Sequence, residues 1–502
     1  MSSLLVCGTS SDAGKSVVVA GLCRYMRDKE IKVAPFKAQN MSLNSAVTAG
    51  GEEIGRAQAA QAFAAGIEPE AAMNPILIKP STDTEAQVIV MGRPLITTDG
   101  ASYGSLRARL LPVVREAFES LRSRFDVVIC EGAGSLAEFN LRDRDLVNLG
   151  FARETRTPVV VVADIDRGGS FAGLYGSLAL LPAADQELVC GFIMNKFRGD
   201  VRLLQDGLAR FATLTGRNFY GVLPWVRDLI IDAEDSLDLS AFRSNLVPPS
   251  GSVLHIAVVR LRSMSNFTDF EPLALEPGVL VRFTNSVSEI AAADLVVLPG
   301  SKSTVADLRF LRASGLDLAI VARADARRPI LGVCGGFQML GQRIIDPVES
   351  RAGDVHGLGV LPVVTEFEVD KVLARRSGRS RRLGADCEGY EIRHGRPRVL
   401  SGEPMFGCDD GDEGCVQGTV WGTSWHGVFE SDPFRKAFLA WTAAANDVDW
   451  SPGDVSFGQA REAQAARLGE LIADHADAEG LMGLVEHGPV SGLPVLSPAG
   501  VA

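Results

Sequence analysis

The chain has 502 residues, enough for about three domains of ordinary size with large buried cores. Its 46% hydrophobic and 22% charged residues are typical of a globular protein, and no stretch approaches the roughly 20 apolar residues of a membrane span. A net charge of −12, without a basic run interleaved with aromatic residues, argues against nucleic acid as a partner.

The amino terminus and the cysteines indicate a cytoplasmic protein. Met1 and two serines run directly into an apolar stretch, without a basic segment or a cleavable signal. The eight cysteines include no CxxC pair, which argues against a disulfide framework and against a zinc cluster.

The first half of the chain alternates short apolar runs with longer helical patterns. Runs that are apolar at every position predict parallel strands buried on both faces, and the alternation predicts helices on both sides of the sheet. The expected strands are 4–7, 32–36, 76–78, 127–130, 159–163, 189–194 and 220–223, and the expected helices are 15–27, 55–65, 103–122 and 202–215.

A second α/β unit is expected after a linker at 246–252, which holds two prolines. Its expected strands are 254–260, 295–298, 330–333 and 416–419. The predicted domains are therefore 1–245 and 252–445. In the tail, 446–502, only the stretch 459–473 has a helical pattern, and we assign the tail no role.

A glycine-containing loop follows the first strand and precedes a helix, which is the context of a nucleotide-binding loop. Its backbone N–H groups and the helix N-terminus would hold phosphate, with a lysine adding positive charge and a serine hydroxyl available to Mg²⁺. The first and last glycines have five residues between them, where the common loop has four, so an ordinary turn is the alternative. The residues expected to bind the nucleotide are Gly8, Thr9, Asp12, Gly14, Lys15 and Ser16.

Polar residues also end the next strands of this sheet, where ligands of open α/β sheets bind. Glu131 is placed to hold Mg²⁺ beside the nucleotide, and Asn195 is placed to contact a purine. The polar segment 37–45 is rich in amides, which suits recognition of amides or carboxylates, although a solvated loop has the same composition. Its Lys37 joins the nucleotide-binding candidates.

A cysteine flanked by glycines ends a buried strand of the second unit. Gly332, Gly335 and Gly336 permit a sharp turn that exposes the sulfur of Cys334. The helix that follows favours the thiolate, and nearby N–H groups can stabilise an oxyanion. A buried structural cysteine is the alternative, which we adopt for the other seven. Cys334 is predicted to be a nucleophile.

The thiolate needs a base, and six histidines are available. His426 follows a predicted strand and precedes a glycine, so it can reach the cysteine from a neighbouring strand. His394 is the second choice. Gly300, at the end of another strand, is expected to supply an oxyanion N–H.

These segments together resemble the cobyric acid synthases of cobalamin biosynthesis, over residues 1 to about 445. The polar segment favours this family over its sister, the cobyrinic acid a,c-diamide synthases. The first half is similar to the dethiobiotin synthetase-type P-loop fold, whose loop also has the extra residue, and the second half to a class I (triad) glutamine amidotransferase domain. The segments that carry the resemblance are 8–16, 36–45, 53–58, 130–135, 164–169 and 331–340.

The resemblance implies ATP- and Mg²⁺-dependent amidation of the b, d, e and g carboxylates of adenosylcobyrinic acid a,c-diamide, with ammonia from glutamine. Many triad glutaminases have a glutamate two residues after the histidine, where this chain has Val428. The resemblance implies the same lack in cobalamin-pathway glutaminases, so the group that orients His426 stays open, with Glu430 as one candidate. The residues expected to bind the corrinoid polycarboxylate are Gln39, Asn40, Arg56, Lys79, Arg142 and Arg167.

Three alternatives remain open from the sequence. The sister diamide synthase shares the chemistry and amidates other carboxylates. A P-loop partitioning or scaffold ATPase usually has an early second lysine, where this chain has Ser10 and Ser11, and lacks a glutaminase domain. A binding protein with an inactive glutaminase domain would not need Cys334 and His426. The sequence does not indicate an oligomeric state.

Overall fold

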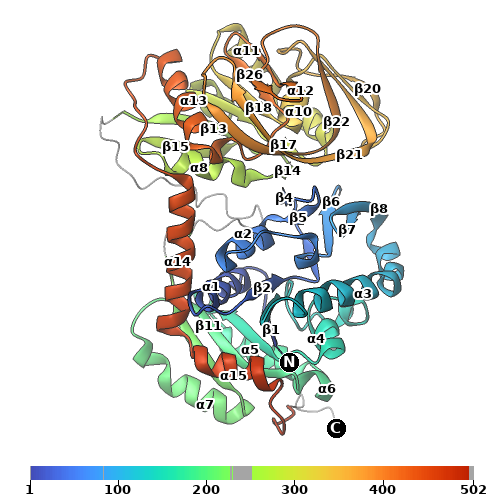
Figure 1. Ribbon diagram of the computed structural model, residues 1–502, viewed down its shortest axis with the longest axis vertical. Helices are drawn as coiled ribbons and strands as arrows, with labels where there is room; N and C mark the ends of the chain where they lie inside the picture. Colours follow the sequence, from blue (N-terminus) through green and yellow to red (C-terminus); the bar gives the residue numbers. More distant parts are fainter. Residues whose placement is uncertain (1, 83, 227–228, 230–251, 497–502) are drawn as a thin grey trace.

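The structure is a computed structural model that describes residues 2–82, 84–226, 229 and 252–496. Most of the expected linker at 246–252 therefore lies outside the described residues. Figure 1 shows two α/β units stacked along the long axis, the first drawn in blue to green and the second in yellow-green to orange. This arrangement agrees with the predicted α/β architecture.

The first unit is built on a six-stranded sheet in which all neighbouring strands are parallel. In sheet order the strands are β12 (Asn218–Pro224), β11 (Val189–Phe197), β10 (Val159–Asp164), β1 (Ser3–Gly8), β9 (Val127–Glu131) and β2 (Val33–Phe36). Its helices are α1 (Lys15–Asp28), α2 (Arg56–Ala65), α3 (Gly100–Arg122), α4 (Leu149–Thr155), α5 (Ser170–Ala179), α6 (Ala183–Gln186) and α7 (Gln205–Thr215).

Successive side chains of β1 enter two different cores. Leu4 and Val6 belong to one apolar cluster, whereas Leu5 and Cys7 belong to another. Because neighbouring residues of a strand point to opposite faces, both faces of the sheet are buried. A strand buried on both faces needs apolar residues at every position, which explains why these runs were recognisable in the sequence.

A smaller four-stranded sheet lies beside the main sheet and contains β6 (Ile76–Pro80), the run predicted at 76–78. Its other strands are β3 (Gln39–Met41), β7 (Glu85–Val90) and β8 (Arg93–Asp99), and next to it is a hairpin of β4 (Ser45–Val47) and β5 (Glu53–Gly55). In Figure 1 these short strands lie on the side of the first unit that faces the second.

The second unit contains another six-stranded sheet, parallel except at its last strand. Its order is β15 (Val279–Thr284), β13 (Leu254–Val259), β16 (Leu295–Leu298), β18 (Ile330–Val333), β26 (Val420–Thr423) and β25 (Cys415–Gln417). The expected strand at 416–419 is wrong in its bounds, because the chain turns at Gly418, with φ 61°, and forms an antiparallel hairpin. Helices of this unit are α8 (Glu271–Leu275), α9 (Val287–Ala292), α10 (Thr304–Ala313), α11 (Leu316–Asp325), α12 (Gly335–Leu340) and α13 (Asp432–Ala445).

A long antiparallel hairpin that the sequence did not predict belongs to a third six-stranded sheet. Its strands are β21 (Val363–Ser380) and β22 (Asp386–Val399), accompanied by β19 (Arg343–Asp346), β20 (Gly353–His356), β23 (Phe406–Cys408) and β24 (Gly411–Glu413). A separate two-stranded pair, β14 (Met264–Ser265) with β17 (Gly300–Ser301), lies near the domain interface.

The tail returns to the first unit. Helix α14 (Phe457–His475) runs along one side of the molecule in Figure 1, and α15 (Ala478–His487) follows it. Apolar residues of both helices share a core cluster with α1 and β1. The two helices α1 and α14 approach closely at Gly21, where a Cβ would lie 2.7 Å from the carbonyl oxygen of Leu468. The tail therefore completes a helix layer on the first sheet, and its second helix was missed in the sequence.

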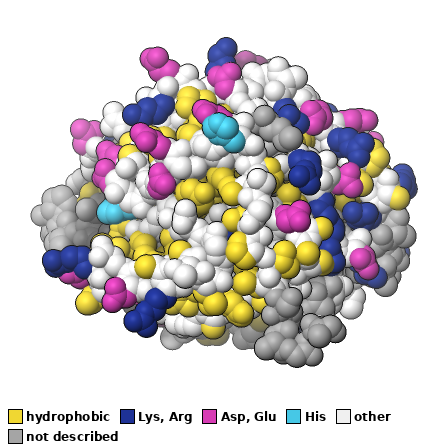
Figure 2. All heavy atoms as spheres, turned by 90° about the horizontal axis from the view of Figure 1, so that it is seen from below, with side chains coloured by type: hydrophobic (Ala, Val, Ile, Leu, Met, Phe, Trp, Pro, Cys, Tyr) yellow, Lys and Arg dark blue, Asp and Glu magenta, His cyan; other side chains and the backbone are white. Residues whose placement is uncertain are grey.

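Figure 2 looks onto the end of the molecule that is lowest in Figure 1. Hydrophobic side chains gather near the middle of this face, and Lys and Arg lie interspersed with Asp and Glu around them. Within the part of the chain that the structure describes, no helix combines the length and apolar character needed to cross a bilayer.

Candidate active site

Cys334 lies at a sharp turn between β18 and α12. Its backbone has φ 50° and ψ −107°, a conformation that costs energy for a residue with a side chain. A Cβ on Gly336 would lie 1.9 Å from the carbonyl oxygen of Leu298, so only glycine fits there. The strand, the strained cysteine and the immediate helix are the geometry of a nucleophile elbow.

His426 and Asp269 form an acid–base pair beside this cysteine. The Nδ1 atom of His426 lies 2.7 Å from Oδ2 of Asp269, and Oδ1 of Asp269 accepts the N–H of Gly427 at 2.9 Å. The thiol of Cys334, which lines the same pocket as His426, donates to the carbonyl oxygen of Ile392 at 3.7 Å. Burial alone would lower the pKa of His426, but Asp269 and Cys334 outweigh burial and raise it to about 10. The site therefore favours the imidazolium form opposite the sulfur.

Glu430 and His394, the candidates from the sequence for the orienting carboxylate and for the second choice of base, have other partners in the structure. The candidate Glu430 does not orient His426, because Glu430 accepts a hydrogen bond from Arg56 at 2.5 Å and Asp269 holds the imidazole. His394 lies in the same pocket, where burial and two lysines lower its pKa to about 4. Its Nδ1 is 3.1 Å from the carbonyl oxygen of Glu368.

Gly300 lies directly against the pair, as a Cβ there would meet Cε1 of His426 at 2.8 Å. The next residue, Ser301, has its backbone nitrogen 2.8 Å from the position of a Cβ on Gly335. The segment predicted to stabilise an oxyanion is thus packed against the cysteine turn. Its role as an oxyanion hole stays a prediction.

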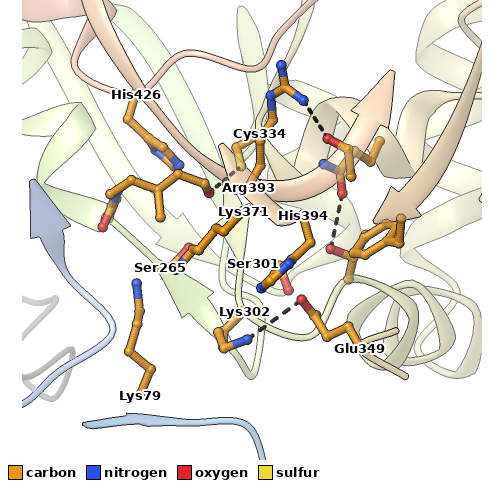
Figure 3. A pocket seen from close by; sticks show the side chains of 16 residues that line it. Lys79, Ser265, Ser301, Lys302, Cys334, Glu349, Lys371, Arg393, His394 and His426 are labelled. Atoms are coloured by element: carbon orange, nitrogen blue, oxygen red, sulfur yellow. Dashed lines mark hydrogen bonds and ion pairs between the residues drawn. The ribbon is translucent and has the colours of Figure 1, made fainter. Parts of the chain in front are cut away.

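A polar pocket opens beside the sulfur, and Figure 3 shows its lining. Lys79 reaches into it from the first unit, whereas the other charged groups come from the second. The charged residues of the lining are Lys79, Lys302, Lys371, Arg393 and Glu349. A pocket with several cations and a carboxylate suits a zwitterionic amino acid such as glutamine.

Lys79 is also part of a buried ionic cluster that crosses the domain interface. Glu53 accepts hydrogen bonds from Lys79 at 2.6 Å and from Lys371 of the second unit at 2.5 Å. Burial alone would raise the pKa of Glu53, but the two lysines outweigh it and hold the pKa well below its usual value. The cluster fixes one wall of the pocket to the first unit.

The glycine loop of the first unit has the form of a phosphate cradle. Gly14 has φ 99°, and a Cβ there would lie 1.9 Å from Nδ2 of Asn195. Lys15 folds back over the loop and donates to the carbonyl oxygens of Ser10 and Gly134, at 2.9 and 3.1 Å. These features fit a nucleotide's phosphates, which would meet the lysine and the N-terminus of α1.

Glu131 is the centre of a buried hydrogen-bond network beside the loop. It accepts from Ser16 at 2.9 Å, from Lys37 at 3.0 Å, and from Gln61. Burial alone would raise the pKa of this carboxyl, but Lys37 and the hydrogen bonds from Gln61 and Lys37 lower it. The ionised carboxylate and the Ser16 hydroxyl are the oxygen donors that Mg²⁺ prefers.

Other nucleotide candidates lie around the same loop. The N–H of Thr9 donates to Val162, and a Cβ on Gly8 would lie 3.1 Å from the ammonium of Lys15. The amide of Asn195 donates to the carbonyl oxygen of Ala13 at 3.0 Å.

The residues predicted to bind the corrinoid do not gather at one point. Arg167 pairs with Asp12 and Asp164 beside the nucleotide loop, whereas Arg142 pairs with the buried Asp185. Arg56 and Lys79 lie at the domain interface. Gln39 is partly buried in β3, and Asn40 is buried and donates to Gln58. Their contact with substrate stays a prediction.

Fold and site together define a two-domain enzyme, in which a nucleotide-binding unit is joined to a cysteine-dependent glutaminase. Residues 4–238 match the family model described as the CobQ/CobB/MinD/ParA nucleotide binding domain, and residues 255–434 match the CobB/CobQ-like glutamine amidotransferase domain.

The chain is similar over its whole length to proteins named cobyric acid synthase. It is 51% identical to that of Frankia casuarinae and covers 99% of both chains. It is 53% identical to that of Streptomyces avermitilis, again over 99% of both chains, and 51% identical to that of Mycolicibacterium paratuberculosis, over 97% of both. The chain belongs to the cobyric acid synthase family and is a glutamine-dependent amidotransferase. The match includes the tail, which the resemblance recognised in the sequence did not reach.

Proposed function

We propose that this enzyme amidates the b, d, e and g carboxylates of adenosylcobyrinic acid a,c-diamide, using ATP, Mg²⁺ and ammonia from glutamine. The observation that carries the proposal is the position of the glutaminase residues. Cys334 and His426 line a pocket to which Lys79 of the nucleotide-binding unit also contributes, and Asp269 holds the imidazole of His426. The expected cytoplasmic location stays a prediction.

In the glutaminase half-reaction, the thiolate of Cys334 attacks the side-chain amide carbon of glutamine. His426 gives its proton to the nitrogen as the C–N bond breaks, and ammonia leaves a thioester behind. His426 then takes a proton from water as the water oxygen attacks the thioester, and the C–S bond breaks to release glutamate and restore the thiolate beside a protonated His426. Each of the two steps passes through a tetrahedral intermediate with a negatively charged oxygen. Backbone N–H groups of the 300–301 segment and of the cysteine turn would stabilise this oxyanion in both steps.

In the synthetase half-reaction, Lys15 and the glycine loop would hold the phosphates of ATP, and Ser16 and Glu131 would hold Mg²⁺. Bound ATP supplies the phosphoryl group that converts a substrate carboxylate into an acyl phosphate. The loop and Lys15 would contribute position and positive charge, on which phosphoryl transfer mainly depends. Ammonia then attacks the carbonyl carbon, and phosphate leaves.

The two halves can be separated by changing the nitrogen source. Amide formation is measured for the wild type, Cys334→Ala and Glu131→Gln, with glutamine or with ammonium chloride. We expect Cys334→Ala to form amide only from ammonium, and Glu131→Gln to lose at least about 100-fold with either source, because the metal ligand acts after ammonia release.

Two results would contradict the proposal. Amide formation from glutamine by Cys334→Ala would show that this thiol is not required. A rate of amidation in Glu131→Gln equal to that of the wild type, at saturating nucleotide, would show that Glu131 is not a ligand of the metal.

A further inference from the structure

The first unit touches the loop that carries Asp269. The amide oxygen of Asn44 accepts the N–H of Phe267 at 3.2 Å, and the N–H of Ser45 donates to the amide oxygen of Asn266 at 2.9 Å. Phe267 opens the short helix η5 (Phe267–Phe270), which contains Asp269. All of these groups are buried. The position of the carboxylate that orients the histidine therefore depends on two residues of the other unit.

The first unit also touches the loop that carries His426. Arg56, at the start of α2 and 5% exposed, donates to Glu430 at 2.5 Å. Glu430 ends the short helix η6 (Val428–Glu430), which follows His426 and Gly427 directly. Both halves of the acid–base pair are thus held from across the domain interface.

The same two segments of the first unit meet at Glu131. Lys37, at the beginning of the segment that leads to Asn44, donates to this carboxylate at 3.0 Å. Gln61 lies on α2, the helix that begins with Arg56, and it donates to the other carboxylate oxygen. One carboxylate in the nucleotide site therefore anchors both segments that hold the acid–base pair.

We propose that Asn44, Ser45 and Arg56 position the acid–base pair of the glutaminase site, so that nucleotide binding in the first unit changes the reactivity of the catalytic thiolate. The inference rests on the proposed placement of Mg²⁺ and ATP at Glu131. A metal ion there competes with Lys37 and Gln61 for the carboxylate oxygens. When the metal ion displaces Lys37 or Gln61 from Glu131, the segment that leads to Asn44 and the helix that begins with Arg56 lose this anchor. Nucleotide binding therefore shifts the population of conformations in which these two segments hold the acid–base pair.

Cys334 itself provides a readout that does not require turnover. Its rate of alkylation by iodoacetamide is measured by mass spectrometry of the Cys334 peptide, with and without Mg²⁺ and adenosine 5′-(β,γ-imido)triphosphate. The rate reports how readily the thiolate forms beside His426. In the wild type we expect the nucleotide to change this rate by between about 5-fold and 150-fold, the usual range of coupling between sites.

Two variants break the contacts, and a third is their matched control. Asn44→Ala removes the acceptor of the Phe267 N–H, and Arg56→Met removes the partner of Glu430. Arg375→Met removes a guanidinium that also crosses the interface, to Val47 and Glu68 at 3.0 Å each, but touches neither loop of the pair. We expect Asn44→Ala and Arg56→Met to lose the response to nucleotide and most of their kcat for glutamine hydrolysis, with a smaller change in KM. Arg375→Met keeps the response, and Arg56→Lys recovers part of it.

If these residues only held the domains together, all three interface variants would change the nucleotide response and kcat to the same extent. The inference is overturned if Arg375→Met loses the response as the others do, if Asn44→Ala and Arg56→Met keep it, or if the wild-type rate is the same with and without bound nucleotide. Should Arg56→Met fail to fold, as judged by circular dichroism, Asn44→Ala decides the question. A wild-type protein that binds no nucleotide in calorimetry overturns the proposed function as well, so the two failures are distinguishable.

Discussion

Replacing Asp269 by asparagine tests the arrangement of the glutaminase site most sharply. Asparagine has nearly the same shape and can still accept the N–H of Gly427, but it carries no charge to stabilise the imidazolium of His426. The wild-type pKa of His426 is raised from 6.5 to about 10 by Asp269 and Cys334, against the opposing effect of burial. That difference corresponds to about 5 kcal/mol in favour of the protonated imidazole.

The expected change in activity follows from the contribution of Asp269 to the raised pKa of His426. A carboxylate in hydrogen-bond contact shifts a pKa by about 1 to 3 pH units, so its loss lowers the pKa of His426 by that amount. The protonated imidazole of His426 then persists over a narrower pH range, and the alkaline limb of the activity profile moves to lower pH. Since the imidazole also loses its orientation, we expect kcat near pH 8 to fall about 10²- to 10⁴-fold.

The assay is glutamate release from glutamine, measured between pH 5.5 and 10 for the wild type and Asp269→Asn. Asp294→Asn is a matched control, because Asp294 accepts the N–H of His255 in the same domain. Wild-type kcat in Asp269→Asn, or an alkaline limb that does not move, would refute the assignment of Asp269.

Three further predictions concern packing. Glu53→Gln leaves two buried lysines without their shared carboxylate, and we expect urea unfolding to show a loss of about 3–5 kcal/mol in unfolding free energy. Gly21→Ala places a methyl group 2.7 Å from a side-chain carbon of Ile472. We expect this contact to outweigh the usual stabilisation of a helix by alanine and to lower the free energy of unfolding by about 1–3 kcal/mol. An unchanged unfolding midpoint would contradict the packing of the tail against α1. Gly14→Ala forces a Cβ against Asn195 at φ 99°, and calorimetry should show nucleotide affinity reduced at least about 10-fold, whereas retained affinity would place the nucleotide elsewhere.

The main sheets could be predicted because their strands are buried on both faces. The run at 4–7 and the run at 330–333 are apolar throughout, and such runs are recognisable without knowledge of their neighbours. The cysteine turn could also be predicted, since glycines on both sides of Cys334 meet a local steric requirement.

The hairpin of β21 and β22 could not be predicted in this way. The strand Val363–Ser380 carries many arginines and acidic residues and is largely exposed along its middle, so it has no apolar period. It is stabilised by pairing with its partner strand and by contacts with the first unit, which are long-range.

Asp269 was missed for a related reason. It lies in the short helix η5, which has no recognisable motif, and only the folding of β13 and β26 into one sheet brings this helix to His426. Glu430 is nearer in sequence but is held by Arg56, a residue of the other domain. Local sequence favoured the wrong carboxylate because the partners of both acids are distant in the chain.

The proposed reaction places glutamine nitrogen on four carboxylates of one corrinoid. The direct measurement is mass spectrometry of adenosylcobyrinic acid a,c-diamide incubated with the enzyme, ATP, Mg²⁺ and amide-¹⁵N glutamine. We expect stepwise incorporation of up to about four labelled nitrogens, each step driven by ATP hydrolysis. Glutamine hydrolysis without incorporation into this corrinoid would contradict the proposed substrate, and incorporation without ATP would contradict the proposed acyl phosphate.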